Sequence, residues 1–112
     1  MKSINKVILI GHLGGKPEGR YTPQGISTAS FSLATNETWV GSDKKKHEHT
    51  EWHHIVAWNK LADFVTSYLD KGHLVYVEGS IKTRTWVNQK KESKKMIEIM
   101  ATQIVPLEKT KV

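Results

Sequence analysis

A chain of 112 residues, 38% of them hydrophobic and 25% charged, is long enough for one compact domain with a modest core. It has no cysteine, which excludes a disulfide, a zinc–thiolate site and a thiol nucleophile, and no apolar run approaches the ~20 residues that span a membrane. The formal charge of +6 and the isoelectric point of about 9.6 favour a polyanionic partner, such as nucleic acid, an acidic membrane surface or an acidic protein.

The first half of the chain predicts three strands, which are separated by a turn and a loop. The strands are indicated by β-branched side chains or by alternation of apolar and polar residues, and the turn by Pro23 and Gly25. In chain order these are a strand over residues 4–13, a turn over 19–26, a strand over 27–39, a polar loop over 41–50 and a strand over 51–58.

The second half predicts one helix followed by two strands. Leu61, Val65 and Leu69 recur at helical spacing, Asn59 is suited to the N-cap and Gly72 to the C-terminus. The predicted elements are a helix over residues 59–72, a long strand over 73–87 with a bend at Gly79, a polar loop over 88–95 and a strand over 96–107 that ends at Pro106.

The predicted order of elements describes an all-β domain with one helix. A five-stranded Greek-key β-barrel with an α-helix between strands 3 and 4 has the OB-fold pattern, an architecture that often binds oligonucleotides. We expect this domain to cover residues 1–106 and residues 107–112 to form a frayed C-terminal end. A fold does not by itself establish a function, so the function has to be inferred from the side chains on each strand face.

Aromatic and basic side chains share faces of the predicted strands. On the strand over residues 51–58, Trp52, His54 and Trp58 point one way, whereas Ile55 and Ala57 point the other way, toward a core.

The strand over residues 73–87 shows the same arrangement. Lys82, Arg84 and Trp86 share one face of this strand. Trp39 ends an earlier strand, next to a loop with three consecutive lysines at 44–46. Every tryptophan of the chain therefore lies on or beside a strand, near positive charge.

This pairing suits single-stranded nucleic acid. Indole rings stack on unpaired bases of any sequence, and lysine and arginine neutralise phosphates, so binding weakens with salt. A duplex hides its base faces from such rings.

Other interpretations stay open. A tryptophan in a strand often belongs to the core, and lysine-rich loops are often only solvated. The histidines at 47, 49, 53 and 54 could suggest a metal site, but the H-E-x-x-H spacing is absent and we expect no metal and no cofactor. An OB-fold protein-interaction module, such as a primosome-type accessory protein, is the main alternative. A hydrolase or metal-dependent nuclease is disfavoured because the eleven acidic residues are dispersed, so we expect no enzyme.

Four segments resemble the bacterial single-stranded DNA-binding protein family. They are NKVILIGHLGGKPEGRYTPQG, FSLATNETW, TEWHHIVAWNKLADFVTSYLDKG and VYVEGSIKTRTW, and the resemblance extends from Asn5 to Ile104. It implies a homotetramer of OB folds that wraps single-stranded DNA during replication, recombination and repair in the cytoplasm, associated with the nucleoid.

The resemblance also implies roles for individual residues. Trp39, Trp52 and Trp86 match the family's stacking tryptophans, and Trp58 stands where the family usually has a stacking phenylalanine. His53 matches a histidine associated with subunit contacts. The basic positions that contact phosphate in the family correspond to Lys60, Lys71, Lys82 and Arg84.

Two departures from the family pattern are visible. His54 stands where the family usually carries arginine, so a contact there would depend on pH. The sequence ends in EKTKV, whereas bacterial members continue into a flexible linker and an acidic tip that recruits replication and repair proteins. Either the chain is trimmed or it is a naturally short form, such as a phage, plasmid, mobile-element or organellar protein; tail-mediated recruitment is not expected from these residues.

Overall fold

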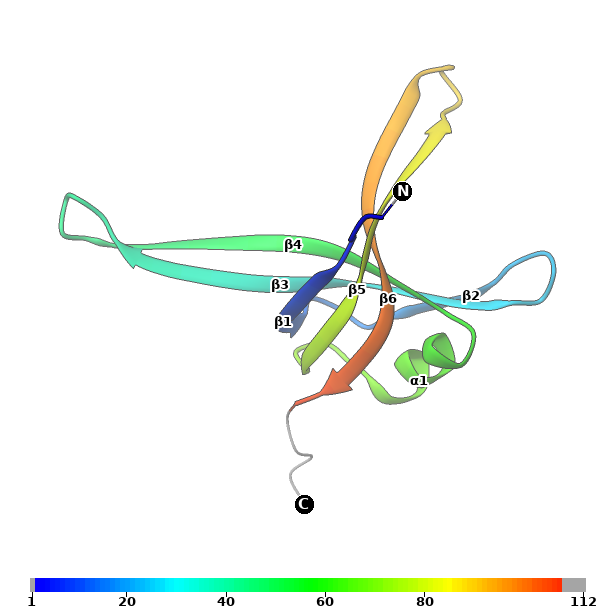
Figure 1. Cartoon of the computed structure of the whole chain (residues 1–112), viewed down its shortest axis with the longest axis horizontal. Helices are drawn as coiled ribbons and strands as arrows, with labels where there is room; N and C mark the ends of the chain where they lie inside the picture. Colours follow the sequence, from blue (N-terminus) through cyan, green and yellow to red (C-terminus); the bar gives the residue numbers. More distant parts are fainter. Residues whose placement is uncertain (1, 108–112) are drawn as a thin grey trace.

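The computed structural model describes residues 2–107, which form one six-stranded sheet and one helix (Figure 1). In chain order the elements are β1 (Val7–Leu13), β2 (Glu18–Tyr21), β3 (Ser27–Val40), β4 (Lys46–Trp58), α1 (Lys60–Tyr68), β5 (Leu74–Val87) and β6 (Ser93–Pro106). The predicted class, mostly β-structure with one helix, is confirmed. No helix within the described residues has the length and apolar character that crossing a membrane requires.

Five of the strands close into a barrel. The strand order is β1-β5-β6-β4-β3, and β3 pairs back to β1 where Leu33 lies opposite Leu13. Neighbouring strands are antiparallel except β4 and β6, which run parallel where Ile55 lies beside Ile99. The short β2 stays outside this ring and pairs with β3 alone among the described strands.

Alternate strand residues fill the barrel, and helix α1 closes one side of it. Ile55 and Ala57, predicted to face the core, are fully excluded from solvent, as is Leu33 of β3. The core consists of Leu13, Ala29, Phe31, Leu33, Ile55, Ala57, Ala62, Val65, Leu69, Val75, Val77, Ile99, Ala101 and Ile104. No tryptophan of the described chain belongs to this core.

The bend predicted at Gly79 is present in β5. The pairing of β5 with β6 shifts register between Glu78 and Gly79. A Cβ atom at Gly79 would overlap the carbonyl oxygen of Met100 on β6, so only glycine lets the two backbones approach this closely. This register shift lets the first part of β5 belong to the barrel and its last part to the β5–β6 hairpin.

The β3–β4 and β5–β6 hairpins extend beyond the barrel in different directions (Figure 1). The β3–β4 hairpin stays paired as far as Val40 opposite Lys46, and the β5–β6 hairpin as far as Val87 opposite Ser93. The predicted loops over residues 41–50 and 88–95 are therefore too long, because pairing continues almost to each turn.

The number of strands is also corrected. Residues 19–26 are predicted as a turn, but β2 begins before them and pairs with β3, and the turn itself is restricted to residues 22–26. The sheet thus has six strands rather than five, and α1 follows the fourth strand, β4, rather than the third. Among the five strands of the barrel, α1 still lies between the third and the fourth in chain order.

Helix α1 covers Lys60–Tyr68 rather than the predicted residues 59–72, and the end of the chain also differs from prediction. Asn59 occupies the N-cap position of α1 as predicted but makes no side-chain capping bond; its backbone has φ of 60° and ψ of −130°, outside the left-handed helical region. Leu107, predicted as frayed, donates its backbone N–H to the carbonyl of Leu74 at 2.9 Å. The rest of the predicted frayed end, residues 108–112, lies outside the described residues.

Candidate nucleic-acid interface

All four tryptophans are exposed. Their exposed fractions are 49% for Trp39, 59% for Trp52, 38% for Trp58 and 41% for Trp86. An indole carries a large apolar surface, and leaving it in water forgoes a stabilisation of about 1.5–3 kcal/mol that burial of a large apolar side chain would bring. Four such side chains on the surface of a small domain indicate that a partner covers them.

The outer face of β4 carries Trp52, His54 and Trp58, as predicted from alternation. The six-membered ring of Trp52 lies directly over Gly14, where a Cβ atom would come within 2.5 Å of Cζ3 of the indole. A groove of about 500 Å³ opens beside this ring and is lined also by Lys16, Ser32 and His54. The absence of a side chain at Gly14 thus lets the indole lie close against the barrel while much of Trp52 stays exposed.

The same kind of face continues on the β5–β6 hairpin. Lys82, Arg84 and Trp86 lie opposite Glu98, Met96 and Lys94 respectively. The guanidinium carbon of Arg84 lies 5.1 Å from the centroid of the Trp86 ring, a cation–π contact.

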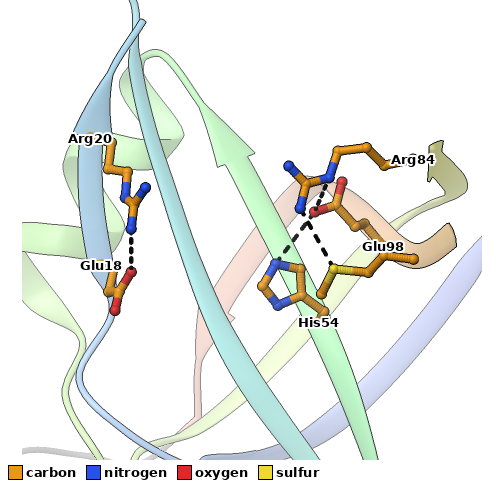
Figure 2. A network of polar contacts seen from close by, with 6 residues as sticks. Glu18, Arg20, His54, Arg84 and Glu98 are labelled. Atoms are coloured by element: carbon orange, nitrogen blue, oxygen red, sulfur yellow. Dashed lines mark hydrogen bonds and ion pairs between the residues drawn. The ribbon is translucent and has the colours of Figure 1, made fainter. Parts of the chain in front are cut away.

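Glu98 connects β4 to this hairpin. Because β4 and β6 run side by side, His54 lies next to Glu98, and the His54 Nε2 to Glu98 Oε2 distance is 3.4 Å. The same carboxylate oxygen lies 3.7 Å from Nε of Arg84 (Figure 2). The structure therefore brings two predicted contact residues from different strands onto one carboxylate, which the sequence analysis did not identify.

Trp39 lies near the tip of the β3–β4 hairpin, away from the barrel, and the pairing register places it on the opposite face of this ribbon from Trp52. Its ring stacks on His47, with centroids 5.6 Å apart and an interplanar angle of 22°. His47 Nε2 lies 3.1 Å from a carboxylate oxygen of Asp43. The backbone N–H of Lys45, and after it the His47 side chain, lower the pKa of the Asp43 carboxyl below its ordinary value. The Asp43 carboxylate thus orients the imidazole that supports the indole.

Trp58 and Lys60 lie at the opposite end of β4, where α1 begins. A second groove, of about 770 Å³, is lined by both of them together with Tyr21. Tyr21 is 76% exposed and offers another aromatic surface, which the sequence did not predict. It belongs to β2, which was predicted as a turn, so no strand face was expected there.

Two predicted residues lie apart from these faces. Lys71 is exposed in the turn after α1, where Gly72 donates its backbone N–H to the carbonyl of Leu13, so this turn is held close to the end of β1. His53 is half-buried on the opposite face of β4 from Trp52, and its Nε2 lies 2.9 Å from Oγ1 of Thr35. The other predicted contact residues form an extended path over the barrel and both hairpins, not a single pocket.

The basic side chains among the predicted contact residues fall into two groups. Lys60, Lys71 and Lys82 form no ion pair with any carboxylate of residues 2–107, whereas His54 and Arg84 share Glu98. Over the same residues no group of three or more histidine, aspartate or glutamate side chains is placed to hold a metal ion.

Comparison with known proteins places this geometry in context. The sequence model of the single-strand binding protein family matches residues 4–107. Single-stranded DNA-binding protein 1 of Chlorobaculum tepidum is 50% identical over 104 residues, which make up 93% of this chain and 62% of that protein. The chain therefore spans less than two thirds of the length of this relative.

Two solved structures share the fold. A Plasmodium falciparum SSB in complex with single-stranded DNA superposes with a TM-score of 0.88 at 36% identity and covers 96% of this chain and 98% of that one. A deletion mutant of the single-stranded DNA-binding protein from Thermus aquaticus gives a TM-score of 0.81 at 30% identity, covering 94% of this chain and 51% of that one.

The seating of Trp52 on Gly14 can be tested by substitution. Gly14→Ala should push the indole away from the barrel while changing the free energy of unfolding little, because the displaced group is the end of a side chain. We expect the emission of Trp52, isolated by replacing the other tryptophans with phenylalanine, to shift. Gly15→Ala is the matched control, since a Cβ atom there meets nothing within 4 Å. Equal emission from both variants would contradict the proposed seat.

Proposed function

Because the chain belongs to the single-strand binding protein family, we propose that it binds single-stranded DNA with little sequence preference and thereby protects it in replication, recombination and repair. The observation that carries this proposal is the exposure of all four indoles, on β3, β4 and β5, together with Lys60 and Lys82, which form no ion pair among the described residues. We assign the binding domain to residues 1–106 and its architecture to the Greek-key OB fold, a class that binds oligonucleotides.

The chemistry of the path fits a single strand better than a duplex. An indole stacks on either face of any base, and each stacked base contributes about 1–3 kcal/mol. The faces of the bases are exposed in a single strand and hidden in a duplex. The lysine ammonium groups match the phosphates between the bases, and their neutralisation releases counterions. The protein acts by binding, and no chemical step is needed.

Individual residues receive the following roles in this proposal. Trp39, Trp52, Trp58 and Trp86 stack on bases, and Lys60, Lys71 and Lys82 contact phosphates. Support for the first set comes from their exposure, and for the second from the absence of an acidic partner among the described residues. His54, at the edge of the groove beside Trp52, supplies a polar contact.

A protein-interaction module of the primosome-accessory type is the competing function. It would use the same indoles as an apolar contact surface for another protein. The two functions differ in salt dependence, because lysine–phosphate contacts weaken steeply with salt, whereas burial of apolar surface does not.

The test is a titration of tryptophan fluorescence with oligo(dT), repeated at stepped salt concentrations and with a duplex. Stacking predicts strong quenching by the single strand, weaker at higher salt and nearly absent with the duplex. Trp52→Ala should weaken binding by about 1–3 kcal/mol for each base that loses its stacking partner.

Tyr68→Ala is a suitable control for the tryptophan variant. Tyr68 is also an exposed aromatic residue, at 56%, but it lies on α1 and stacks on Phe64 within the same helix. We expect this variant to bind as the unmodified protein does. Absence of quenching at low salt, or equal quenching by duplex, would reject single-strand binding.

We also propose that copies of the chain assemble into a homotetramer, with the outer face of β1 as a contact surface. Ile8 and Ile10 are 56% and 55% exposed there, and Ile10 lies opposite Tyr76 of β5. Val105 of β6, opposite Tyr76 on its other side, extends the same apolar patch. Such a patch is typical of an interface between subunits.

Sedimentation velocity tests this assembly. The unmodified chain should sediment as a tetramer, and the double variant Ile8→Lys, Ile10→Lys as a smaller species, because charge would be buried at the contact. Ile97→Lys is the control, since this isoleucine is 67% exposed on the β5–β6 hairpin, away from β1. A tetramer that survives the double substitution would exclude this face as the contact.

A further inference from the structure

Glu98 is an unexpected residue on a surface proposed to bind a polyanion. Its side chain is only 14% exposed, and it lies between β4 and β5 in the middle of the path. A carboxylate at this place repels phosphates, so its presence requires that it contribute something else to the site.

The contacts of Glu98 show which side chains it acts on. Oε2 lies 3.4 Å from Nε2 of His54 and 3.7 Å from Nε of Arg84 (Figure 2). Lys82, directly opposite Glu98 in the strand pairing, makes no ion pair among the described residues. One oxygen of the carboxylate thus contacts both an imidazole and a guanidinium. The ammonium group of the neighbouring Lys82 stays available for a phosphate.

Arg84 is held at three points by its surroundings. Glu98 engages Nε, the Met96 sulfur accepts a hydrogen bond from a terminal nitrogen at 3.7 Å, and the guanidinium carbon lies 5.1 Å from the Trp86 ring centroid. A guanidinium is planar and stacks on aromatic rings and bases, which an ammonium group cannot do. Its charge is balanced by the carboxylate beside it.

We propose that Glu98 is a positioning residue that holds Arg84 as a stacking extension of Trp86, so that Arg84 presents its plane to a base rather than its charge to a phosphate. The inference rests on the proposed function and deepens it. The predicted cations then have two different roles, because Lys60, Lys71 and Lys82 neutralise phosphates, whereas Arg84 enlarges the aromatic platform. This role also departs from the family resemblance, which implies a phosphate contact for Arg84.

The dependence of affinity on salt distinguishes the two roles. For single strands the logarithm of the binding constant falls with the logarithm of salt concentration by about 0.7 for each phosphate neutralised. A side chain that neutralises a phosphate contributes to this slope, whereas one that stacks contributes to affinity alone. The slope is therefore a readout that a purely structural role of Glu98 would not change.

The experiment measures oligo(dT) affinity at stepped salt for the full chain and for the variants Glu98→Gln, Arg84→Lys and Lys82→Gln. Glu98→Gln should release Arg84 toward phosphate and steepen the slope by about 0.7. Arg84→Lys, which keeps the charge and loses the plane, should weaken binding about two- to fivefold at an unchanged slope. Lys82→Gln should make the slope shallower by about 0.7.

Glu37→Gln is the matched control for the lost negative charge. Glu37 is exposed on β3 and forms no ion pair among the described residues, so this variant should keep the slope of the unmodified chain. Circular dichroism of each variant verifies the fold.

Two results would overturn the role of Glu98: a slope for Glu98→Gln equal to that of Glu37→Gln, or full affinity of Arg84→Lys. The first would mean that removing the carboxylate does not free Arg84 for phosphate, and the second that the plane of Arg84 contributes nothing to binding. Failure of the unmodified chain to bind oligo(dT) would instead reject the proposed function. The affinity of the unmodified chain therefore tells whether the function or only the role of Glu98 is wrong.

Discussion

The alternation of side chains along β4 and β5 is the constraint on which the rest of the structure depends. On β4, Ile55 and Ala57 complete the core while Trp52 and Trp58 are left on the outside. A shift of one residue in the register would bury both indoles and expose the aliphatic residues. The pairing that stabilises the barrel therefore also determines which surface is aromatic.

The two hairpins extend this surface beyond the barrel. A barrel of this size has little outer area, but β3–β4 and β5–β6 continue as paired ribbons well past the core (Figure 1). Trp39 and Trp86 lie on these ribbons, and local contacts orient them: His47 supports the first ring and Arg84 the second. Side chains with preset orientations lose less conformational entropy on binding, so orientation itself contributes to affinity.

The sequence was sufficient to predict the class of fold, the helix, the bend at Gly79 and the outward direction of the tryptophans on β4. These features follow from local patterns, namely alternation, helical spacing and a glycine within a strand. The short β2 was missed because Pro23 and Gly25 indicate a turn, and nothing local shows that Glu18–Tyr21 reaches β3.

The network around Glu98 could not be predicted because strand register depends on turn length. The predicted loop over residues 88–95 would place Val87 opposite Met96, whereas the structure places Val87 opposite Ser93. That difference of three residues would move Glu98 from Lys82 to a position opposite Thr85, on the other face of the hairpin. The contact with His54 also requires the parallel pairing of β4 with β6, between segments far apart in the chain.

The four indoles, in the function proposed for this chain, form one binding path for single-stranded DNA. The most direct test is to follow the four indole N–H signals by nuclear magnetic resonance in isotope-labelled protein during titration with oligo(dT). Stacking predicts that all four signals shift together and saturate at the same ratio of strand to protein, while amide signals of the buried core stay in place. Binding that leaves the indole signals unchanged would show that the strand lies elsewhere and would contradict a shared path of indoles.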